Sequence, residues 1–234
     1  MKNIIEFKNV TKEYDLGEKK LLAVDKISFT IDEGEFVVIL GPSGAGKSTV
    51  LNLLGGMDFA SSGEIIINGK NITNYKDEKL TEYRADNVGF VFQFYNLIPT
   101  LTALENVALT KEVVKDSLDP VKVLTSVGLG DHLNKFPSQL SGGEQQRVSI
   151  ARAICKNPTM LLCDEPTGAL DSETGIVILS LLQQMSRENK KTVIIVSHNS
   201  ALAQAADKVI RIKNGKVRDI IINESPLAVS EVNW

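Results

Sequence analysis

Cysteine is scarce in this chain of 234 residues, which contains only two. Cys155 and Cys163 are too few for a disulfide framework or a zinc site, and Cys163 lies inside an apolar run that predicts a strand. We therefore expect both thiols to be reduced and neither to take part in chemistry.

Long apolar runs and a strong net charge are also missing. No stretch approaches the roughly 18 apolar residues that a membrane-spanning helix needs, and residues 1–6 lack the apolar region of a signal peptide. The net charge of −3 provides no large basic face, so it supports neither nucleic-acid binding nor adhesion to anionic lipid. We expect a cytoplasmic globular protein with no nucleic-acid partner.

The most informative stretch is a glycine-rich segment between two apolar runs, residues 36–40 and 50–54. Its spacing is G-x-x-x-x-G-K-S, in which backbone N–H groups curl around a phosphate at the start of a helix. Glycine-rich turns also join strands to helices in folds without nucleotide, but the flanking runs favour phosphate binding here. We expect Lys47 to reach the β- and γ-phosphates and Ser48 to bind Mg²⁺. The segment reads Gly41, Pro42, Ser43, Gly44, Ala45, Gly46, Lys47, Ser48, Thr49.

Apolar runs of strand length recur along the chain and predict an α/β fold. Those at 36–40, 88–92, 160–163, 193–196 and 209–212 are nearly unbroken, as expected for parallel strands covered on both faces. The runs within 4–31 and at 64–67 indicate an antiparallel sheet beside this core, and Asn214-Gly215 predicts a hairpin over 208–222. We expect the ligand at the carboxyl ends of the parallel strands.

Residues 93–158 have a helical pattern instead and contain no convincing strand. Asp119 is a plausible N-cap for a helix over 120–127 that ends at Gly128. We interpret this block as a helical insertion in the α/β core rather than a separate domain.

Two adjacent acids, Asp164 and Glu165, follow the run at 160–163. At a strand end, one carboxylate can hold Mg²⁺ while the other polarises a water for attack on a γ-phosphate. We assign the metal to Asp164 and the water to Glu165. An ordinary strand end with solvated acids would look the same, and the phosphate loop upstream favours the functional interpretation.

A second anion site is predicted at the start of another helix. Ser141 and Glu144 have the spacing of a capping box, which alone indicates only a well-capped helix. Gly142 and Gly143 each cost a helix about 1 kcal/mol relative to alanine, but in the first turn they let an external group reach bare N–H donors. Two such helix starts imply either two ligands or one ligand held between two chains.

These motifs together resemble the nucleotide-binding subunit of ATP-binding cassette transporters. The resemblance implies a P-loop NTPase (RecA-like) core with an N-terminal antiparallel β subdomain and an inserted α-helical subdomain. It implies one domain over 1–234, with the core and β subdomain in 1–92 and 159–222, the helical subdomain in 93–158 and a C-terminal tail in 223–234. The motifs occur in order over nearly the whole chain at 41–49, Gln93, 140–145, 160–165, 169–171 and His198.

The same resemblance implies an ATPase that uses ATP and Mg²⁺ and forms a head-to-tail homodimer in ATP. Each ATP would lie between the phosphate loop of one copy and Ser141, Gly142 and Gly143 of the other. His198 also follows an apolar run, where a strand-end hydrogen-bonding residue is the alternative, and Tyr14 could instead be a core or turn residue. The implied roles are adenine stacking for Tyr14, coupling of the Mg²⁺ shell to the helical block for Gln93, a link between sites for Asp171 and a γ-phosphate contact for His198.

Residues 92–107 and 137–140 are similar to the MacB/LolD group, which serves macrolide and peptide efflux, antimicrobial-peptide resistance and lipoprotein release. The partner implied is a transmembrane permease on a separate chain, which places this subunit on the inner face of the membrane. Phe94 and Tyr95 fit a docking groove for a permease helix, unless Phe94, Leu97 and Ile98 pack inside the helical block.

Three other functions are considered. The first is a regulatory ATPase similar to the FtsE type, which drives a membrane partner controlling cell-wall hydrolases. The sequence hardly separates this function from that of an exporter. A soluble cassette acting on DNA or the ribosome resembles chains with a long coiled coil or two tandem cassettes, and neither feature occurs here. A module that binds nucleotide without hydrolysis is disfavoured by the intact Glu165, Gln93 and His198.

Overall fold

The computed structural model describes residues 3–17 and 19–234. Six α-helices occur in this part of the chain: α1 (Lys47–Leu54), α2 (Asp77–Asn87), α3 (Ala103–Ala108), α4 (Pro120–Ser126), α5 (Gly142–Cys155) and α6 (Ser172–Arg187). Its strands are β1 (Asn3–Asp15), β2 (Lys20–Asp32), β3 (Phe36–Leu40), β4 (Ser62–Ile67), β5 (Lys70–Asn71), β6 (Val88–Phe92), β7 (Met160–Asp164), β8 (Thr192–Ser197), β9 (Lys208–Lys213) and β10 (Lys216–Ile222). Within the same residues, no helix is both long enough and apolar enough to span a membrane.

A six-stranded sheet forms the centre of the molecule, in the order β10-β9-β3-β8-β7-β6. All neighbouring pairs are parallel except β9 and β10, which form the predicted hairpin. Strand β3 is buried on both faces because its residues alternate between two apolar clusters, one on each side of the sheet. The five parallel strands thus lie where the unbroken apolar runs predict them.

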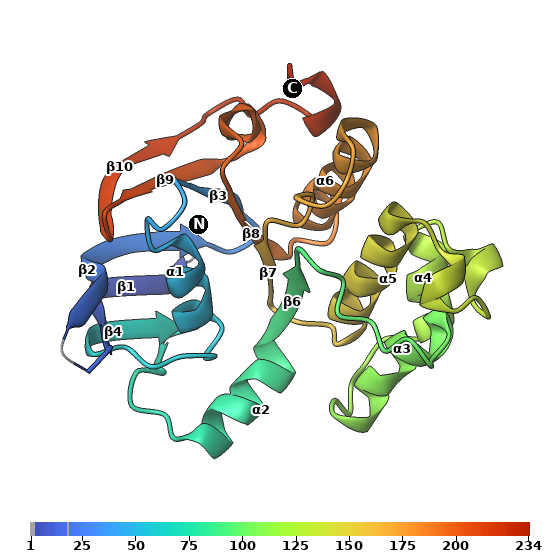
Figure 1. The fold of residues 1–234 in the computed structure, drawn as a ribbon, viewed down its shortest axis with the longest axis horizontal. Helices are drawn as coiled ribbons and strands as arrows, with labels where there is room; N and C mark the ends of the chain where they lie inside the picture. The colour runs from blue at the N-terminus through green and yellow to red at the C-terminus, as the bar shows by residue number, and fades with distance from the viewer. Residues whose placement is uncertain (1–2, 18) are drawn as a thin grey trace.

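The second sheet is antiparallel, has the order β2-β1-β4-β5, and packs with α1 against one face of the central sheet. Helix α6 covers the opposite face. Figure 1 shows the antiparallel sheet at one end of the molecule and α3, α4 and α5 grouped at the other. The antiparallel sheet and the core agree with the fold expected from the sequence.

Residues 93–158, all of them described, contain helices and turns and no strand. Asp119 caps α4 by accepting hydrogen bonds from the N–H groups of Val121 and Lys122, so the predicted cap is confirmed. Helices α3, α4 and α5 share an apolar cluster of their own. The C-terminal segment is not a loose tail, because Val229 and Val232 are buried in the cluster under α6.

Candidate functional site

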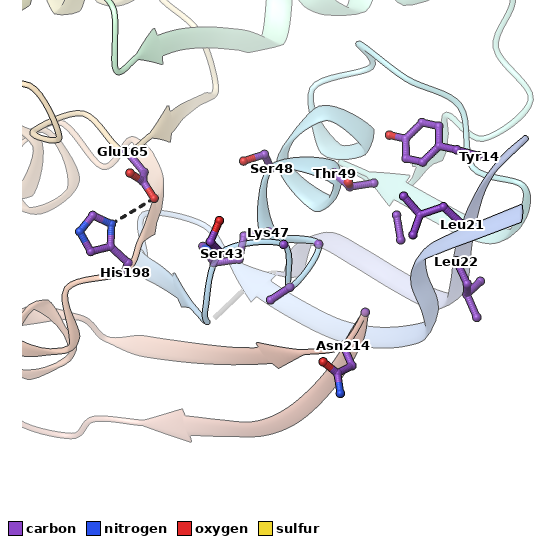
Figure 2. A pocket seen from close by; sticks show the side chains of 15 residues that line it. Tyr14, Leu21, Leu22, Ser43, Lys47, Ser48, Thr49, Glu165, His198 and Asn214 are labelled. Carbon is purple, nitrogen blue, oxygen red and sulfur yellow. Dashed lines mark hydrogen bonds and ion pairs between the residues drawn. The ribbon is translucent and has the colours of Figure 1, made fainter. Parts of the chain in front are cut away.

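An open pocket of about 680 Å³ lies at the carboxyl edge of the central sheet. Strands β3, β7 and β8 end side by side there, since Leu40 pairs with Ser197 and Asp164 pairs with Val196. Residues that immediately follow each of these strands line the pocket or border it. Figure 2 shows the phosphate loop in the middle, Glu165 and His198 at one end and Tyr14 at the other.

The glycine-rich loop connects β3 to α1, and its residues 43–49 line the pocket. Gly46 has a φ of +100°, and a Cβ there would lie 2.3 Å from the carbonyl oxygen of Ala23. A Cβ on Gly41 would lie 2.2 Å from the carbonyl oxygen of Ile212. Only glycine fits these two positions, so the sequence pattern holds the loop tightly between β2 and β9 at the start of α1.

Lys47 is the first residue of α1 and is only 7% exposed. Its ammonium donates a hydrogen bond of 3.0 Å to the carbonyl oxygen of Pro42 within the same loop. The side chain therefore folds back over the loop, where its positive charge adds to the positive end of the α1 dipole. This arrangement favours the binding of an anion at the start of α1.

Asp164 ends β7 and lies against the start of α1. The Ser48 hydroxyl donates a 3.2 Å hydrogen bond to Asp164 Oδ1, so the two residues predicted to bind a metal are brought together. Burial raises the pKa of Asp164 and the neighbouring Glu165 charge raises it further, while the Ser48 hydrogen bond and Lys47 oppose this. A divalent cation would favour the ionised carboxylate, and hydroxyl and carboxylate oxygens are donors that suit Mg²⁺.

Glu165 and His198 form a pair at one end of the pocket. His198 Nδ1 lies 3.2 Å from Glu165 Oε1, and the side chains are 68% and 27% exposed for His198 and Glu165 respectively. Glu165 has a φ of +47°, a left-handed conformation that residues with a Cβ seldom adopt. The turn directs its carboxylate toward the pocket and His198 instead of continuing along β7.

Tyr14 lies at the opposite end, with Leu21 and Leu22 of β2 also lining the pocket. Its hydroxyl donates a 2.7 Å hydrogen bond to Asp58 Oδ2. Burial and the Asp58 carboxylate raise the pKa of Tyr14, and the Thr49 side chain opposes them. The ring is therefore neither a core tyrosine nor a turn residue, but part of the pocket wall.

Gln93 does not line this pocket. It follows β6 at the same edge of the sheet, and its amide packs against Gly168, where an added Cβ would lie 2.8 Å from Gln93 Nε2. Gly168 itself belongs to the turn after Glu165, because its N–H donates a hydrogen bond of 3.0 Å to the Glu165 carbonyl oxygen. Gln93 thus reaches the acidic turn from the side of the helical block.

The Ser141 motif also lies away from the pocket. Ser141 and Glu144 form the predicted capping box of α5, with the Ser141 N–H 2.7 Å from Glu144 Oε2. His132 Nδ1 lies 2.7 Å from the other Glu144 oxygen. A Cβ on Gly142 would lie 2.7 Å from the Tyr95 hydroxyl, and one on Gly143 would lie 2.3 Å from Thr174 Cγ2. The two glycines therefore also permit close packing. Glycine at a helix start can serve either close packing or anion binding, and the sequence alone does not tell the two apart.

Asp171 is the N-cap of α6, where it accepts a 2.9 Å hydrogen bond from the Thr174 N–H. That bond lowers the pKa of Asp171. Asp171 lines a second, smaller hollow of about 300 Å³ together with Glu165, His198 and Trp234. It is thus close to the acidic turn but is not part of the phosphate-loop pocket.

Several residues at the site are not predicted to belong to it from the sequence. Leu21, Leu22 and Asn214 line the pocket, and Asp58 holds Tyr14. Gln146 of α5 is fully buried, and its amide donates hydrogen bonds to the carbonyl oxygens of Phe92 (3.2 Å) and Pro166 (2.6 Å). These contacts join segments far apart in the sequence, so a local pattern does not reveal them.

The comparisons with known proteins agree with this geometry. A family model described as ABC transporter matches residues 24–168. An ABC transporter ATP-binding protein of Thermotoga maritima is 44% identical to this chain and covers 94% of it, and the match spans 96% of that relative. This chain belongs to the ABC transporter family. A second relative, MJ0796 of Methanocaldococcus jannaschii, is 45% identical over 92% of this chain and 95% of its own length.

Solved structures place this ABC transporter domain among the ATP-binding cassettes. The dimeric MJ0796 cassette bound to ADP and phosphate has a TM-score of 0.86 and 42% identity, covering 94% of this chain and 99% of the other. Some relatives are longer, since the chain spans 50% of an ABC transporter ATP-binding protein of Mycoplasma genitalium that is 43% identical over 99% of this chain. The fold is that of an ABC ATPase, and ATPases of this family bind ATP and are coupled to transport.

Proposed function

We propose that this chain binds and hydrolyses ATP to energise a membrane permease carried by a separate chain. The convergence of the phosphate loop, Asp164 and the Glu165–His198 pair at one sheet edge is the observation that supports this most directly. Lys47 and the loop N–H groups hold the β- and γ-phosphates, Tyr14 stacks on the adenine, and His198 contacts the γ-phosphate.

Ser48 and Asp164 would hold Mg²⁺, with Gln93 approaching from the helical block. The fit rests on the hydroxyl and carboxylate oxygens that already lie 3.2 Å apart. The bound cation would neutralise charge on the two terminal phosphates. Glu165 orients a water and accepts its proton as the water attacks the γ-phosphate, and His198 holds the Glu165 carboxylate in place.

The site is completed by a second copy of the chain. The start of α5, at Ser141, Gly142 and Gly143, offers N–H donors but does not line the pocket of its own chain. A head-to-tail homodimer brings this helix start over the ATP held by the partner copy. The dimeric MJ0796 cassettes, which are 42% and 43% identical to this chain, support such an assembly.

The whole of 1–234 then acts as one ATP-binding domain. Residues 1–92 and 159–222 form the core with its β subdomain, 93–158 form the helical subdomain, and 223–234 form a tail that packs against α6. Phe94, which is 71% exposed, and the neighbouring Tyr95 receive a helix of the permease. Docking there holds the subunit on the inner face of the membrane.

The substrate class is proposed from similarity to the MacB/LolD group. A macrolide export ATP-binding/permease protein, MacB of Rhodopirellula baltica, is 40% identical over 92% of this chain, which spans 33% of that relative. We infer export or release of a peptide, antibiotic or lipoprotein. An FtsE-like role remains the second candidate. Purifying the complex from native membranes and sequencing the partner separates the two, because the FtsE-like role requires a partner that controls cell-wall hydrolases.

Replacement of Glu165 by glutamine tests the catalytic assignment. Glu165→Gln should keep ATP affinity but lower phosphate release by about a hundredfold or more, since the amide cannot accept the proton. The variant should also accumulate as a dimer in ATP and Mg²⁺, measured by light scattering. Glu188→Gln, an exposed change at the far end of α6, serves as the control. Hydrolysis by Glu165→Gln at the parent rate would show that another group polarises the water.

A further inference from the structure

Tyr14 is held by two charged residues that lie outside the family motifs. Asp58 accepts a 2.7 Å hydrogen bond from the Tyr14 hydroxyl on Oδ2, and Lys12 Nζ lies 2.5 Å from Oδ1. The Lys12 ammonium also lies over the Tyr14 ring, 4.7 Å from its centroid. We call these three residues the Tyr14 cluster.

The cluster is well fixed on the Asp58 side. Oδ1 of Asp58 also accepts a 2.7 Å hydrogen bond from the Phe59 N–H, and Lys12 Nζ donates to the Phe59 carbonyl oxygen at 2.9 Å. The side chains of Lys12 and Asp58 are only 12% and 22% exposed. Burial raises the pKa of Asp58, but the hydrogen bonds from Lys12 and Tyr14 outweigh it and hold that pKa below its usual value.

The cluster connects two parts of the pocket. Lys12 and Tyr14 are two residues apart in β1, so they project from the same face of the strand. Asp58 lies in the turn that follows α1, the helix whose first residue is Lys47. Helix α1 therefore begins at the phosphate loop and ends shortly before Asp58, the residue that holds the Tyr14 ring.

We propose that Asp58, supported by Lys12, is a positioning residue that fixes the Tyr14 ring for stacking on the nucleotide base. The proposal rests on the proposed function, in which the pocket binds ATP. A tyrosine without this anchor would rotate freely at the pocket edge, and binding would have to order it. Because Lys12 covers one face of the ring, the base stacks on the opposite face.

Binding of ADP and of inorganic pyrophosphate, measured by calorimetry in Mg²⁺, tests the proposal. Both ligands use the phosphate loop, but only ADP has a base. Because stacking of the base on the ring contributes to ADP binding, we expect Asp58→Ala to weaken ADP binding by about fivefold to tenfold. Pyrophosphate affinity should not change. Asp116→Ala, at an exposed aspartate of the helical block, is the matched control and should alter neither.

A second variant separates positioning from folding. Tyr14→Phe keeps the ring but removes the hydroxyl, so it should reproduce the loss of ADP affinity seen with Asp58→Ala. Combining the two changes should weaken ADP binding no more than either alone, because both remove the same hydrogen bond. Additive losses, or equal losses for ADP and pyrophosphate, would overturn the positioning role and indicate that Asp58 supports the local fold.

Tyr14→Ala distinguishes failure of this inference from failure of the adenine assignment. If Tyr14→Ala weakens ADP but not pyrophosphate while Asp58→Ala weakens neither, Tyr14 binds the base and the positioning role of Asp58 is wrong. If neither Tyr14→Ala nor Asp58→Ala changes the ratio of the ADP and pyrophosphate affinities, the ring does not contact the base and both assignments fail. Loss of ADP binding in both Tyr14→Ala and Asp58→Ala, with pyrophosphate binding intact, supports both.

Discussion

At the scale of single residues, Glu165 differs from an ordinary acid at a strand end. Its left-handed backbone, with φ +47°, costs a residue with a Cβ about 1–2 kcal/mol. The conformation is held by hydrogen bonds of 3.0 Å from its N–H to the Val196 carbonyl oxygen and from the Gly168 N–H to its own carbonyl oxygen. Strain maintained in this way is typical of functional sites, and it favours the catalytic interpretation over a solvated strand end.

The two cysteines contrast with Glu165, because both are buried and burial raises the pKa of each thiol. Cys155 lies at the end of α5, and its Sγ is 3.2 Å from the Leu118 carbonyl oxygen. Cys163 is enclosed in β7. Burial thus disfavours the thiolate, the reactive form of cysteine, at both positions.

Lys47→Ala tests the phosphate loop at the residue scale. A hydrogen bond to a charged group contributes about 1.5–3 kcal/mol, so the variant should bind ADP at least about tenfold more weakly in calorimetry. Because Lys47 also bonds to Pro42, melting temperatures of the variant and parent should be compared. Lys70→Ala, at an exposed residue of β5, is the control. Unchanged ADP affinity in a folded Lys47→Ala variant would show that Lys47 does not reach the phosphates.

At the scale of elements, α5 connects the helical block to the turns that follow β6 and β7. The buried Gln146 amide donates to the carbonyl oxygens of Phe92, just before Gln93, and Pro166, just after Glu165. A rigid helix thus fixes the ends of β6 and β7 relative to each other. Movement of the helical block would therefore shift the turn that carries Glu165, through Gln146 and through the contact of Gln93 with Gly168.

Gln146→Leu should therefore impair both stability and catalysis. The change preserves the approximate volume but removes the donor of the buried Pro166 carbonyl oxygen and of the partly buried Phe92 carbonyl oxygen, and a buried acceptor left unsatisfied costs about 1–3 kcal/mol. We expect a lower melting temperature and, below it, slower phosphate release with little change in ADP affinity. Gln184→Leu on the exposed face of α6 is the control. A variant that melts lower but hydrolyses ATP at the parent rate would limit Gln146 to a structural role.

Elements with a strong burial pattern are predictable from sequence, and α2 shows why others are not. Only Leu80 and Tyr83 of its eleven residues are buried, so the apolar pattern is too weak to give the bounds of this helix from the sequence. The helix is held by tertiary contacts, including hydrogen bonds from the Tyr83 hydroxyl to the Leu54 carbonyl oxygen at 2.7 Å and from Arg84 to the Gly56 carbonyl oxygen at 2.6 Å. Such contacts exist only after the chain has folded.

The same distinction applies to the site. The phosphate loop and the Asp164-Glu165 pair are local patterns, so the sequence predicts where they lie. The bond between Tyr14 and Asp58 joins residues 44 positions apart, and that between Gln146 and Pro166 joins residues 20 apart. Neither pair has a spacing that implies contact, and only the packing of the sheet against the helices brings them together.

At the scale of the whole molecule, the predicted anion sites lie on different parts of the chain. The phosphate loop belongs to the core beside the antiparallel sheet, whereas the start of α5 belongs to the helical block at the other end (Figure 1). The Ser141 motif does not line the pocket of its own copy. This separation means that one copy cannot hold a single ligand between both sites, and the dimeric MJ0796 cassettes then favour one ligand held between two chains.

Mixing two inactive variants tests this arrangement. Ser141→Arg should bind ADP as the parent does but hydrolyse ATP poorly, because the arginine would block the helix start that we propose to cover the partner's ATP. Glu165→Gln lacks the carboxylate that we propose to be catalytic but keeps an intact Ser141. In a head-to-tail heterodimer, one site combines both defects and the other has Glu165 from one copy and Ser141 from the other, so it is intact.

An equal mixture should therefore recover hydrolysis that neither variant shows alone. If the copies assort at random and the sites act independently, half of the dimers are heterodimers with one intact site each, giving roughly a quarter of the parent rate. Phosphate release at saturating ATP provides the measurement, and the double variant Ser141→Arg/Glu165→Gln mixed with either single variant is the matched control, since no intact site can form. A mixture no more active than the average of its components would mean that Ser141 acts on the ATP of its own chain.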